Sequence, residues 1–391
     1  MSLPALRRRL LDLVGTGGPA SLDDLGAADW LEIDRLAALH RLQPLLHALH
    51  GDDPAIPAEI GQAWRTAHRS AALVAMNQHA ALGECAALLE QAGHAPIALK
   101  GAWLAAHAYP AAALRPMRDH DLLVPLDGVR EAFQVLLEAG YREAETAEMS
   151  LDDVIRLDKH MPALISPRGT VVELHHHLWE RDGRLDHASP ATDEAALRAR
   201  AIVSPDGIRF LHPQDTLAHL IVHAVYSHRL DCGPLLLPDI DFLVRAAPID
   251  WVQFWDQARA GNWRGGARLV LDLVAHYRPG AQIDFTPDRG GPAPPELLAA
   301  APDLLLQELE TRRSAGLAAA ALKAGPAKLL ERLRGQRSAA GEAPVTRDMA
   351  HEGGALGWAS SRAWRSFSEL ARRDVRRQSR QLAALSRWLD Q

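Results

Sequence analysis

One stretch of the sequence carries most of its chemistry: Leu99-Lys100-Gly101, then Arg115-Pro116-Met117-Arg118, then Asp119-His120-Asp121-Leu122-Leu123-Val124. Two carboxylates, one residue apart, stand at the head of an apolar segment. Successive strand residues point to opposite faces, so Asp119 and Asp121 project to one side while Leu122 and Val124 can enter the core. Such a pair is costly unless a cation lies between the carboxylates. This geometry suits a magnesium ion.

The composition is that of a soluble globular protein. The chain has 391 residues, enough for two or three domains, of which 48% are hydrophobic and 24% charged. A net charge of −6 argues against a surface that coats nucleic acid. Two distant cysteines fit neither a disulfide framework nor a zinc finger. The sequence shows no export signal and no apolar run long enough to span a membrane, so we predict a cytoplasmic protein with no membrane partner.

The pattern along the chain predicts three regions. Residues 1–92 read as helical, because leucines recur at spacings of three and four. Residues 93–200 read as a compact α/β unit, and residues 201–391 as a second helical region with a polar, Gly-rich and poorly ordered segment at 335–354. We therefore predict an α+β fold in which a small mixed sheet with its helices is embedded in a largely helical chain.

Within the α/β unit, turn residues separate short apolar segments. Ile97 to Leu99 reads as a buried strand that runs into Gly101 and a helix to about His107. The other expected elements are a strand over 119–124, a helix over 129–139, a strand after the Gly140 turn, and a hairpin of 161–165 and 170–175 around Ser166-Pro167-Arg168-Gly169.

The second helical region is read from helix signals. Asp215 and Asp239 are expected to cap two helices, and Trp251 to Ala260 is expected to form a third. The alternative for Asp239 is a side chain that faces the substrate. Asp241 lies two residues after Asp239, so on a helix the two carboxylates diverge and do not share a metal. His219 and His223 lie four residues apart, which we interpret as a packed helix face because no third zinc ligand accompanies them.

The Leu-Lys-Gly entry and the Arg115-Pro116-x-x-Asp119-x-Asp121 strand resemble the uncharacterised bacterial nucleotidyltransferases of the polymerase-β superfamily. The resemblance is close across residues 95–180 and weaker beyond them. It implies a polymerase-β-like core in which an Asp-x-Asp pair holds two magnesium ions. It also implies a third carboxylate on a neighbouring strand, for which Glu173 is the candidate. Two departures stand out: Lys100-Gly101 replaces the family's Gly-Ser turn, and Arg118 stands where a small residue is usual.

The chemistry gives each candidate a role. Asp119, Asp121 and Glu173 would hold Mg²⁺, or alternatively Mn²⁺, since hard cations take carboxylate oxygens. Glu173 could also accept the proton of an attacking hydroxyl. Lys100, which is one of four lysines in the chain, and the amides of Gly101 and Ala102 would meet the phosphates of the donor.

Two further residues are candidates for binding the donor. Arg115, which stands before Pro116, is a second candidate for binding phosphate. His175 shares a strand face with Glu173, which allows a metal or phosphate role.

These roles predict an enzyme that transfers a nucleotidyl group from a nucleoside triphosphate to an acceptor hydroxyl or phosphate and releases pyrophosphate. The acceptor would be a small molecule, a modified peptide or a protein. One alternative is a metal-dependent glycosyltransferase that uses a nucleotide sugar, and another is a non-catalytic binding scaffold. Arginines between 362 and 388 form one face of a last expected helix, which we interpret as a solvated face, so a nucleic-acid partner is not favoured.

Overall fold

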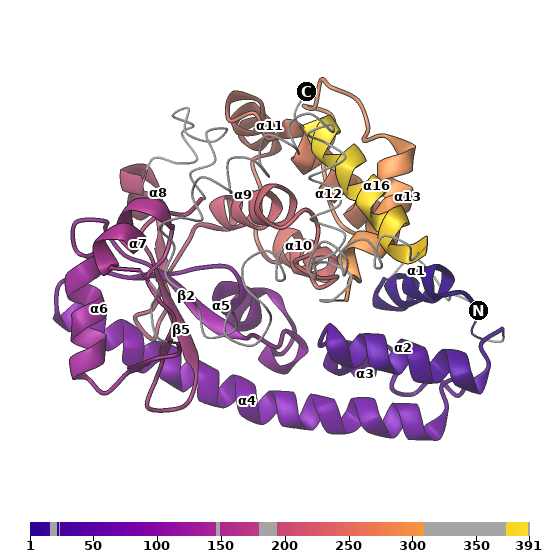
Figure 1. Cartoon of the computed structure of the whole chain (residues 1–391), viewed down its shortest axis with the longest axis horizontal. Coiled ribbons are helices and arrows are strands. Elements are labelled where there is room, and N and C mark those ends of the chain that lie inside the picture. Colours follow the sequence, from indigo (N-terminus) through magenta and orange to yellow (C-terminus); the bar gives the residue numbers. More distant parts are fainter. Residues whose placement is uncertain (16–21, 23, 146–148, 180–193, 309–372, 390–391) are drawn as a thin grey trace, which may run out of the picture. The chain divides into compact units, whose positions relative to one another are not determined.

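The computed structural model describes the chain apart from residues 16–21, 23, 146–148, 180–193, 309–372 and 390–391 (Figure 1). The described residues form two units. One consists of residues 1–228 and 232–294, and the other of residues 229–231 and 295–391. The segment 335–354, which was expected to be poorly ordered, lies outside the described residues. The division into three regions at residues 92 and 200 stays a prediction.

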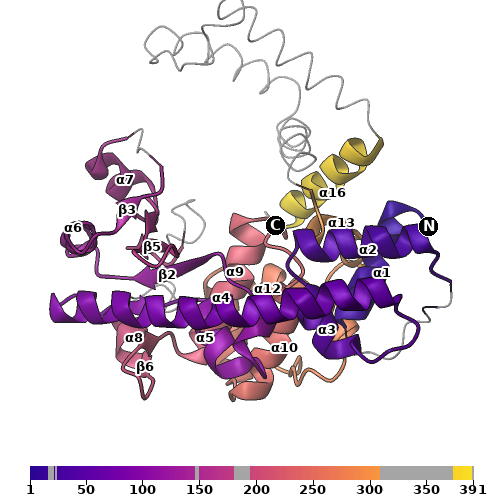
Figure 2. The ribbon, with the colours of Figure 1, turned by 90° about the horizontal axis from the view of Figure 1, so that it is seen from below.

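The amino-terminal region is helical, as predicted. It consists of α1 (Leu3–Val14), α2 (Ala27–Leu39), α3 (Gln43–His50) and the 34-residue helix α4 (Ala58–Gln91). Trp64 of α4 is fully buried and donates from Nε1 to Asp34 Oδ1 over 2.9 Å, which fastens α4 to α2. Figures 1 and 2 show α4 running past both the α2–α3 pair and the sheet.

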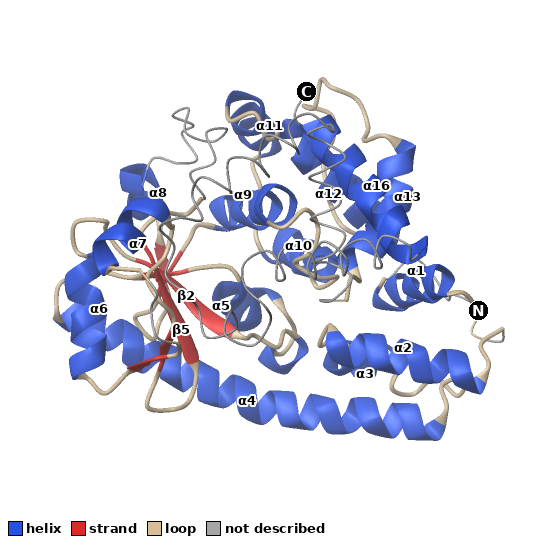
Figure 3. Cartoon of the chain, in the orientation of Figure 1, coloured by secondary structure: helices blue, strands red, loops and turns tan. Residues whose placement is uncertain are grey.

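A mixed sheet lies at the centre of the α/β region (Figure 3). In the described part of the chain it has seven short strands in the order β3-β4-β5-β2-β1-β7-β6. Its strands are β1 (Ile97–Ala98), β2 (Asp119–Leu123), β3 (Arg142–Glu143), β4 (Leu164–Ile165), β5 (Val171–His175), β6 (Ile202–Val203) and β7 (Arg209–Phe210). β2 pairs with β5 in parallel and with β1 antiparallel, while β4 and β5 form the predicted hairpin.

Both faces of the central strand are buried. Leu122 and Val124 are fully buried, as predicted, and Leu123 on the opposite face packs in an apolar cluster with Ile97 and Leu99. Strands covered on both sides read as continuous apolar runs, which explains the Leu-Leu-Val ending of β2. The covering helices include α6 (Val129–Glu138), which lies where the pattern predicted a helix, and α8 (Glu194–Arg200).

This unit also has four short helical segments in its described part. The α5 turn (Gly101–Trp103) continues into the π-helix η1 (Leu104–Ala108), so the helix predicted after Gly101 is confirmed. The 3-10 turn η2 (Ala112–Leu114) precedes β2, and the π-helix η3 (His223–Ser227) extends α9.

The helices that follow the sheet are α9 (Pro213–Val222), α10 (Leu236–Ala246), α11 (Trp251–Ala260) and α12 (Arg264–Tyr277). Trp255 and Trp263 are buried and contact the ring of Phe254, whereas Trp251 is half-buried.

Two predicted helix caps are wrong. Helix α9 begins at Pro213, a residue that favours the first helical position, and His212 Nδ1 accepts the Gln214 amide over 3.3 Å. Asp215 therefore lies inside the helix. Helix α10 begins at Leu236, because a proline is tolerated in the first turn, so Asp239 also lies inside its helix rather than at the cap.

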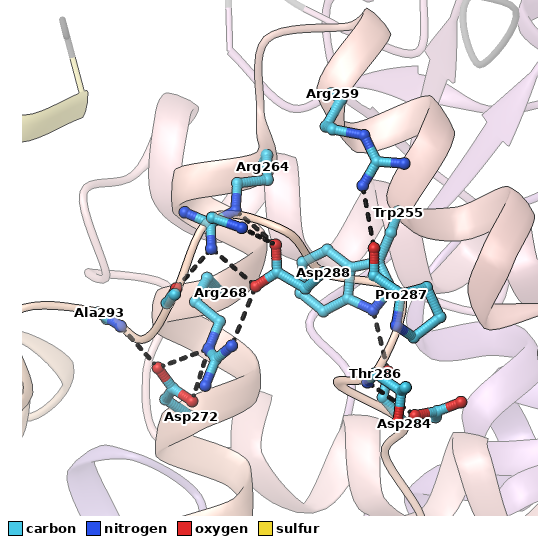
Figure 4. A network of polar contacts seen from close by, with 12 residues as sticks. Trp255, Arg259, Arg264, Arg268, Asp272, Asp284, Thr286, Pro287, Asp288 and Ala293 are labelled. Atoms are coloured by element: carbon cyan, nitrogen blue, oxygen red, sulfur yellow. Dashed lines mark hydrogen bonds and ion pairs between the residues drawn. The ribbon is translucent and has the colours of Figure 1, made fainter.

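The loop between α12 and residue 295 is held by arginines of α12 (Figure 4). Asp288 accepts two bonds from Arg264, both 2.7 Å long, and one of 2.9 Å from Arg268. Its side chain is fully buried. Trp255 of α11 donates to the Asp284 carbonyl over 2.9 Å. The Pro- and Gly-rich loop is thus anchored to the helices by a few polar contacts.

In the second unit, α13 (Pro295–Leu305) packs against α16 (Arg373–Leu389). Arg377 of α16 pairs with Asp303 over 3.1 Å, while Arg376, Arg380 and Arg387 are exposed. The last predicted helix is confirmed from Arg373 onward, and its expected beginning at 362 lies outside the described residues. Among the described helices, none is both long enough and apolar enough to cross a membrane.

Candidate active site

The parallel pairing of β2 with β5 brings the predicted acidic residues together. In this register Asp121 lies opposite Glu173, and Leu123 lies opposite His175. Because alternate residues of a strand share a face, Glu173 and His175 project on the side of Asp121. One ligand atom from each of Asp121, Glu173 and His175 lies within 4.8 Å of the other two. These three side chains form a group that can hold a metal ion.

Asp121 is the most tightly held carboxylate of the group. Lys100 Nζ lies 3.0 Å from its Oδ2, and His175 Nε2 lies 2.8 Å from its Oδ1. Burial alone would raise the pKa of Asp121, but the charges of Lys100 and His175 outweigh burial and hold the pKa well below its usual range. Asp121 is therefore ionised at neutral pH.

Glu173 and His175 each favour the charged form of the other. His175 Nε2 lies 3.6 Å from Glu173 Oε2, and this contact lowers the pKa of Glu173. Burial would lower the pKa of His175, yet Asp121 and Glu173 raise it above its ordinary value. A carboxylate that is ionised and only part-buried can accept a proton from a substrate group.

Asp119 is on the same strand but in a different situation. Burial raises the pKa of Asp119, and the negative charges of Asp121 and Glu173 raise it further, against the opposing effects of Lys100 and Arg115. In the described part of the chain, Asp119 makes no ion pair within 4.0 Å and lies outside the group of possible metal ligands. Asp119 is close enough to Asp121 and Glu173 for their charges to raise its pKa. Its role as a metal ligand stays a prediction.

Lys100 stands at a strained turn between β1 and α5. Its φ of 46° and ψ of −114° place it in a region that glycine adopts readily and other residues rarely. Such strain persists where the surrounding structure enforces it, and it is concentrated at functional sites. The Ala102 amide, expected to face phosphate, donates instead to the Leu99 carbonyl over 3.3 Å.

Arg115 is fixed against this turn. Its guanidinium makes bonds of 3.1 and 2.9 Å to the two oxygens of Asp239, which also accepts the Tyr109 hydroxyl over 2.7 Å. A Cβ on Gly101 would lie 2.5 Å from Arg115 Nη1, so glycine is needed for the guanidinium to approach the backbone. Arg115 thus links α10 to the turn that carries Lys100. Asp241, as expected, turns away from Asp239 and pairs with Arg278 over 2.6 Å.

Several histidines near the site were missed or assigned no role there. His160 Nε2 lies 3.9 Å from Glu173 Oε2. The sequence does not indicate this contact, because His160 lies outside the strands and pairs with β5 only through an isolated bridge to His175. His219 is buried, as a packed helix face requires, with its ring 5.0 Å from that of Trp179. Burial lowers the pKa of His219 and of His223 well below the usual range, and nearby Lys100 lowers both further, so both are neutral.

The comparison with known families agrees with this geometry. Residues 26–279 match a family described as uncharacterised nucleotidyltransferase, which covers more than half of the chain. The chain belongs to this family. The match includes the amino-terminal helices from α2 onward, the whole sheet and helices α9 to α12 of this nucleotidyltransferase. No curated protein matches the chain.

Membership of the family identifies the protein as an enzyme, a transferase of nucleotidyl groups. Nucleotidyl transfer needs ionised carboxylates close together and cationic groups beside them, because the phosphates and the metal carry opposite charges. The nucleotidyltransferase has such a grouping at the β2–β5 pair, with Asp121, Glu173 and His175 beside Lys100.

Proposed function

We propose that this nucleotidyltransferase uses a divalent cation, Mg²⁺ or Mn²⁺, to move a nucleotidyl group from a nucleoside triphosphate to an acceptor hydroxyl or phosphate. The observation that carries the proposal is the register of β2 and β5, which sets Asp121 opposite Glu173 with Lys100 Nζ 3.0 Å from Asp121. The acceptor would be a small molecule or a peptide.

The residues at this point fit a divalent cation. Asp121 and Glu173 supply oxygen atoms, the ligands that magnesium prefers, and both have a lowered pKa, so they are ionised at neutral pH. Asp119 would be a third ligand, since its repulsion from Asp121 and Glu173 is relieved by positive charge. A bound cation would neutralise phosphate oxygens and lower the pKa of the acceptor hydroxyl.

The chain's own residues would carry out the remaining work. Lys100, Gly101 and Arg115 would bind phosphate oxygens of the donor, because an ammonium, an amide and a guanidinium meet at this turn. Glu173 would accept the acceptor's proton. The acceptor oxygen then bonds to the α-phosphorus, the bond from that phosphorus to the bridging oxygen breaks, and pyrophosphate leaves. His175 would hold Asp121 and Glu173 in one orientation.

Ligand-dependent thermal stability tests this proposal without knowledge of the acceptor. A nucleoside triphosphate with Mg²⁺ at about 100 times its Kd should stabilise the protein by about 2.7 kcal/mol, which raises the midpoint by several degrees. Asp119→Asn should abolish this shift. Without ligand the same variant should be slightly more stable than the parent, because it removes a repelled carboxylate.

Glu173→Gln should behave like Asp119→Asn toward the nucleotide. Asp127→Asn is the matched control, since Asp127 is exposed just beyond β2. A Mg²⁺-dependent shift that survives in both site variants would contradict the proposal. A shift with nucleotide sugars but with none of the triphosphates would identify a glycosyltransferase instead, and no shift with either donor would favour a scaffold.

A further inference from the structure

The loop that leads into β2 is pinned by the amino-terminal helices. Arg41, in the turn between α2 and α3, donates from Nη1 to the Pro116 carbonyl over 3.2 Å. Gln78 of α4 donates to the next carbonyl, that of Met117, over 3.0 Å. These contacts hold Arg115 and Arg118, which flank the two carbonyls, at the start of β2. The guanidinium of Arg41 is therefore brought beside the loop that carries both other arginines.

Arg41 occupies a position where glycine is the usual residue. It follows the end of α2 with a φ of 58°, and the Leu42 amide donates back to the Ala37 carbonyl over 2.7 Å, as in a Schellman motif. A residue with a Cβ costs stability there. This backbone conformation, together with the bond from Nη1 to the Pro116 carbonyl, fixes where the Arg41 guanidinium lies.

The charges around this loop are not balanced. Asp239 is occupied by Arg115, and Asp119 is the other carboxylate that acts on Arg41. Burial and the charges of Arg118 and Arg115 lower the pKa of Arg41 to about 10. Among the described residues, the buried Arg41 Nε has no hydrogen-bond partner, and the exposed Arg118 makes no ion pair with a carboxylate. The surroundings of Arg41 thus hold two further guanidinium groups, those of Arg115 and Arg118, and two carboxylates, those of Asp119 and Asp239.

We infer that Arg41 and Arg118, with Arg115, form a binding site for a phosphate-class oxyanion of a substrate, at the Asp119 end of the candidate active site. Guanidinium groups suit this ligand because their N–H donors match phosphate oxygens in pairs. The inference rests on the proposed function, which places substrates beside Asp119. It goes further by giving the amino-terminal helices a part in substrate binding. The anion is either the terminal phosphates of the donor or a phosphate carried by the acceptor.

Titration calorimetry with inorganic phosphate and with pyrophosphate tests the site directly, because it needs no turnover. Arg118→Gln removes an exposed side chain, and Arg41→Gly removes a guanidinium while relieving the backbone, so both variants should fold. Each should weaken binding of these anions about tenfold or more, as expected for loss of a charged hydrogen bond. Arg69→Gln, an exposed arginine of α4 with the same loss of charge, should leave binding unchanged. Unchanged affinity in both site variants would overturn the inference.

Repeating the titration with a non-hydrolysable nucleoside triphosphate and Mg²⁺ already bound distinguishes the two sources of the anion. If inorganic phosphate still binds and the variants weaken it, the site accepts a phosphate of the acceptor. If the triphosphate excludes phosphate and the variants bind the triphosphate about tenfold less tightly, the site holds the donor. Both results support the oxyanion site. Failure of the proposed function is separate: Asp119→Asn and Glu173→Gln would then keep the Mg²⁺-dependent nucleotide shift, whatever the arginine variants do.

Discussion

At Lys100 the backbone is strained while the side chain makes an ion pair, so we predict that glycine there gives a more stable protein than alanine. The φ of 46° strains any residue other than glycine, while the ammonium lies 3.0 Å from Asp121 in a pair whose side chains are 15% and 8% exposed. Lys100→Ala removes the ion pair and keeps the strain. Lys100→Gly removes the same ion pair and relieves the strain.

The two variants should therefore differ in stability in favour of glycine. Strain at such a position costs about 1–3 kcal/mol, and glycine gives back about 0.4–1 kcal/mol through the freedom of the unfolded chain. The free energy of unfolding of Lys100→Gly should exceed that of Lys100→Ala by roughly 1–2 kcal/mol. Both should be less stable than the parent, by up to about 3 kcal/mol, since each leaves Asp121 with one cation fewer.

Urea unfolding at neutral pH without nucleotide or metal measures these differences. The same pair of changes at Arg69, in the middle of α4, is the control, because there glycine should be the less stable by about 1 kcal/mol. If Lys100→Gly were no more stable than Lys100→Ala, the strained turn would be refuted. If Lys100→Gly kept the full thermal shift with a nucleoside triphosphate, Lys100 would not be a phosphate ligand.

Two further predictions concern the buried side chains of His120 and Asp288. Burial lowers the pKa of His120 from 6.5 to about 4, so between these pH values the unfolded chain binds more protons and stability rises with pH. The shift corresponds to about 3 kcal/mol. The variant His120→Leu should therefore make the free energy of urea unfolding depend less steeply on pH, whereas a change at exposed His79 should leave the slope unchanged. Asp288→Asn should lower the free energy of unfolding by roughly 3 kcal/mol, because it leaves Arg264 and Arg268 without their shared carboxylate. The control Asp256→Asn, at an exposed position, should stay within about 0.5 kcal/mol of the parent. Equal losses in the two variants would refute the buried network.

Much of the α/β region could be predicted from local signals. The Asp-x-Asp strand, the Ser166 to Gly169 turn and the Gly140 turn each have a pattern that belongs to one element, and each was found where expected. The approach of Glu173 to Asp121 followed from the resemblance, since strand alternation gives the face of a residue but not which strands pair. The parallel register supplied that information.

What escaped prediction depends on contacts between distant residues. Asp239 carries an ordinary capping signal, and its actual role came from Arg115 and Tyr109, more than a hundred residues away. Arg41 follows the end of α2 and belongs to no sequence motif. Its place beside Pro116 depends on how the amino-terminal helices pack against the loop before β2. The strain at Lys100 could not be predicted either, because a lysine carries no local signal for a positive φ.

The parallel pairing of β2 with β5 also bears on how the protein acquires its activity. Parallel neighbours need a crossover, which here contains α6, β3, α7 (Leu151–Leu157), β4 and the turn before β5. The loop-closure entropy of that crossover has to be overcome before Asp121 and Glu173 meet, and contacts of this kind slow folding. A nascent chain that ends before β5 therefore holds Asp119 and Asp121 but lacks Glu173 and His175, so the group cannot form. Nucleotide binding that depends on both carboxylates reports on completed folding of the sheet, and it begins when the central pair of strands closes.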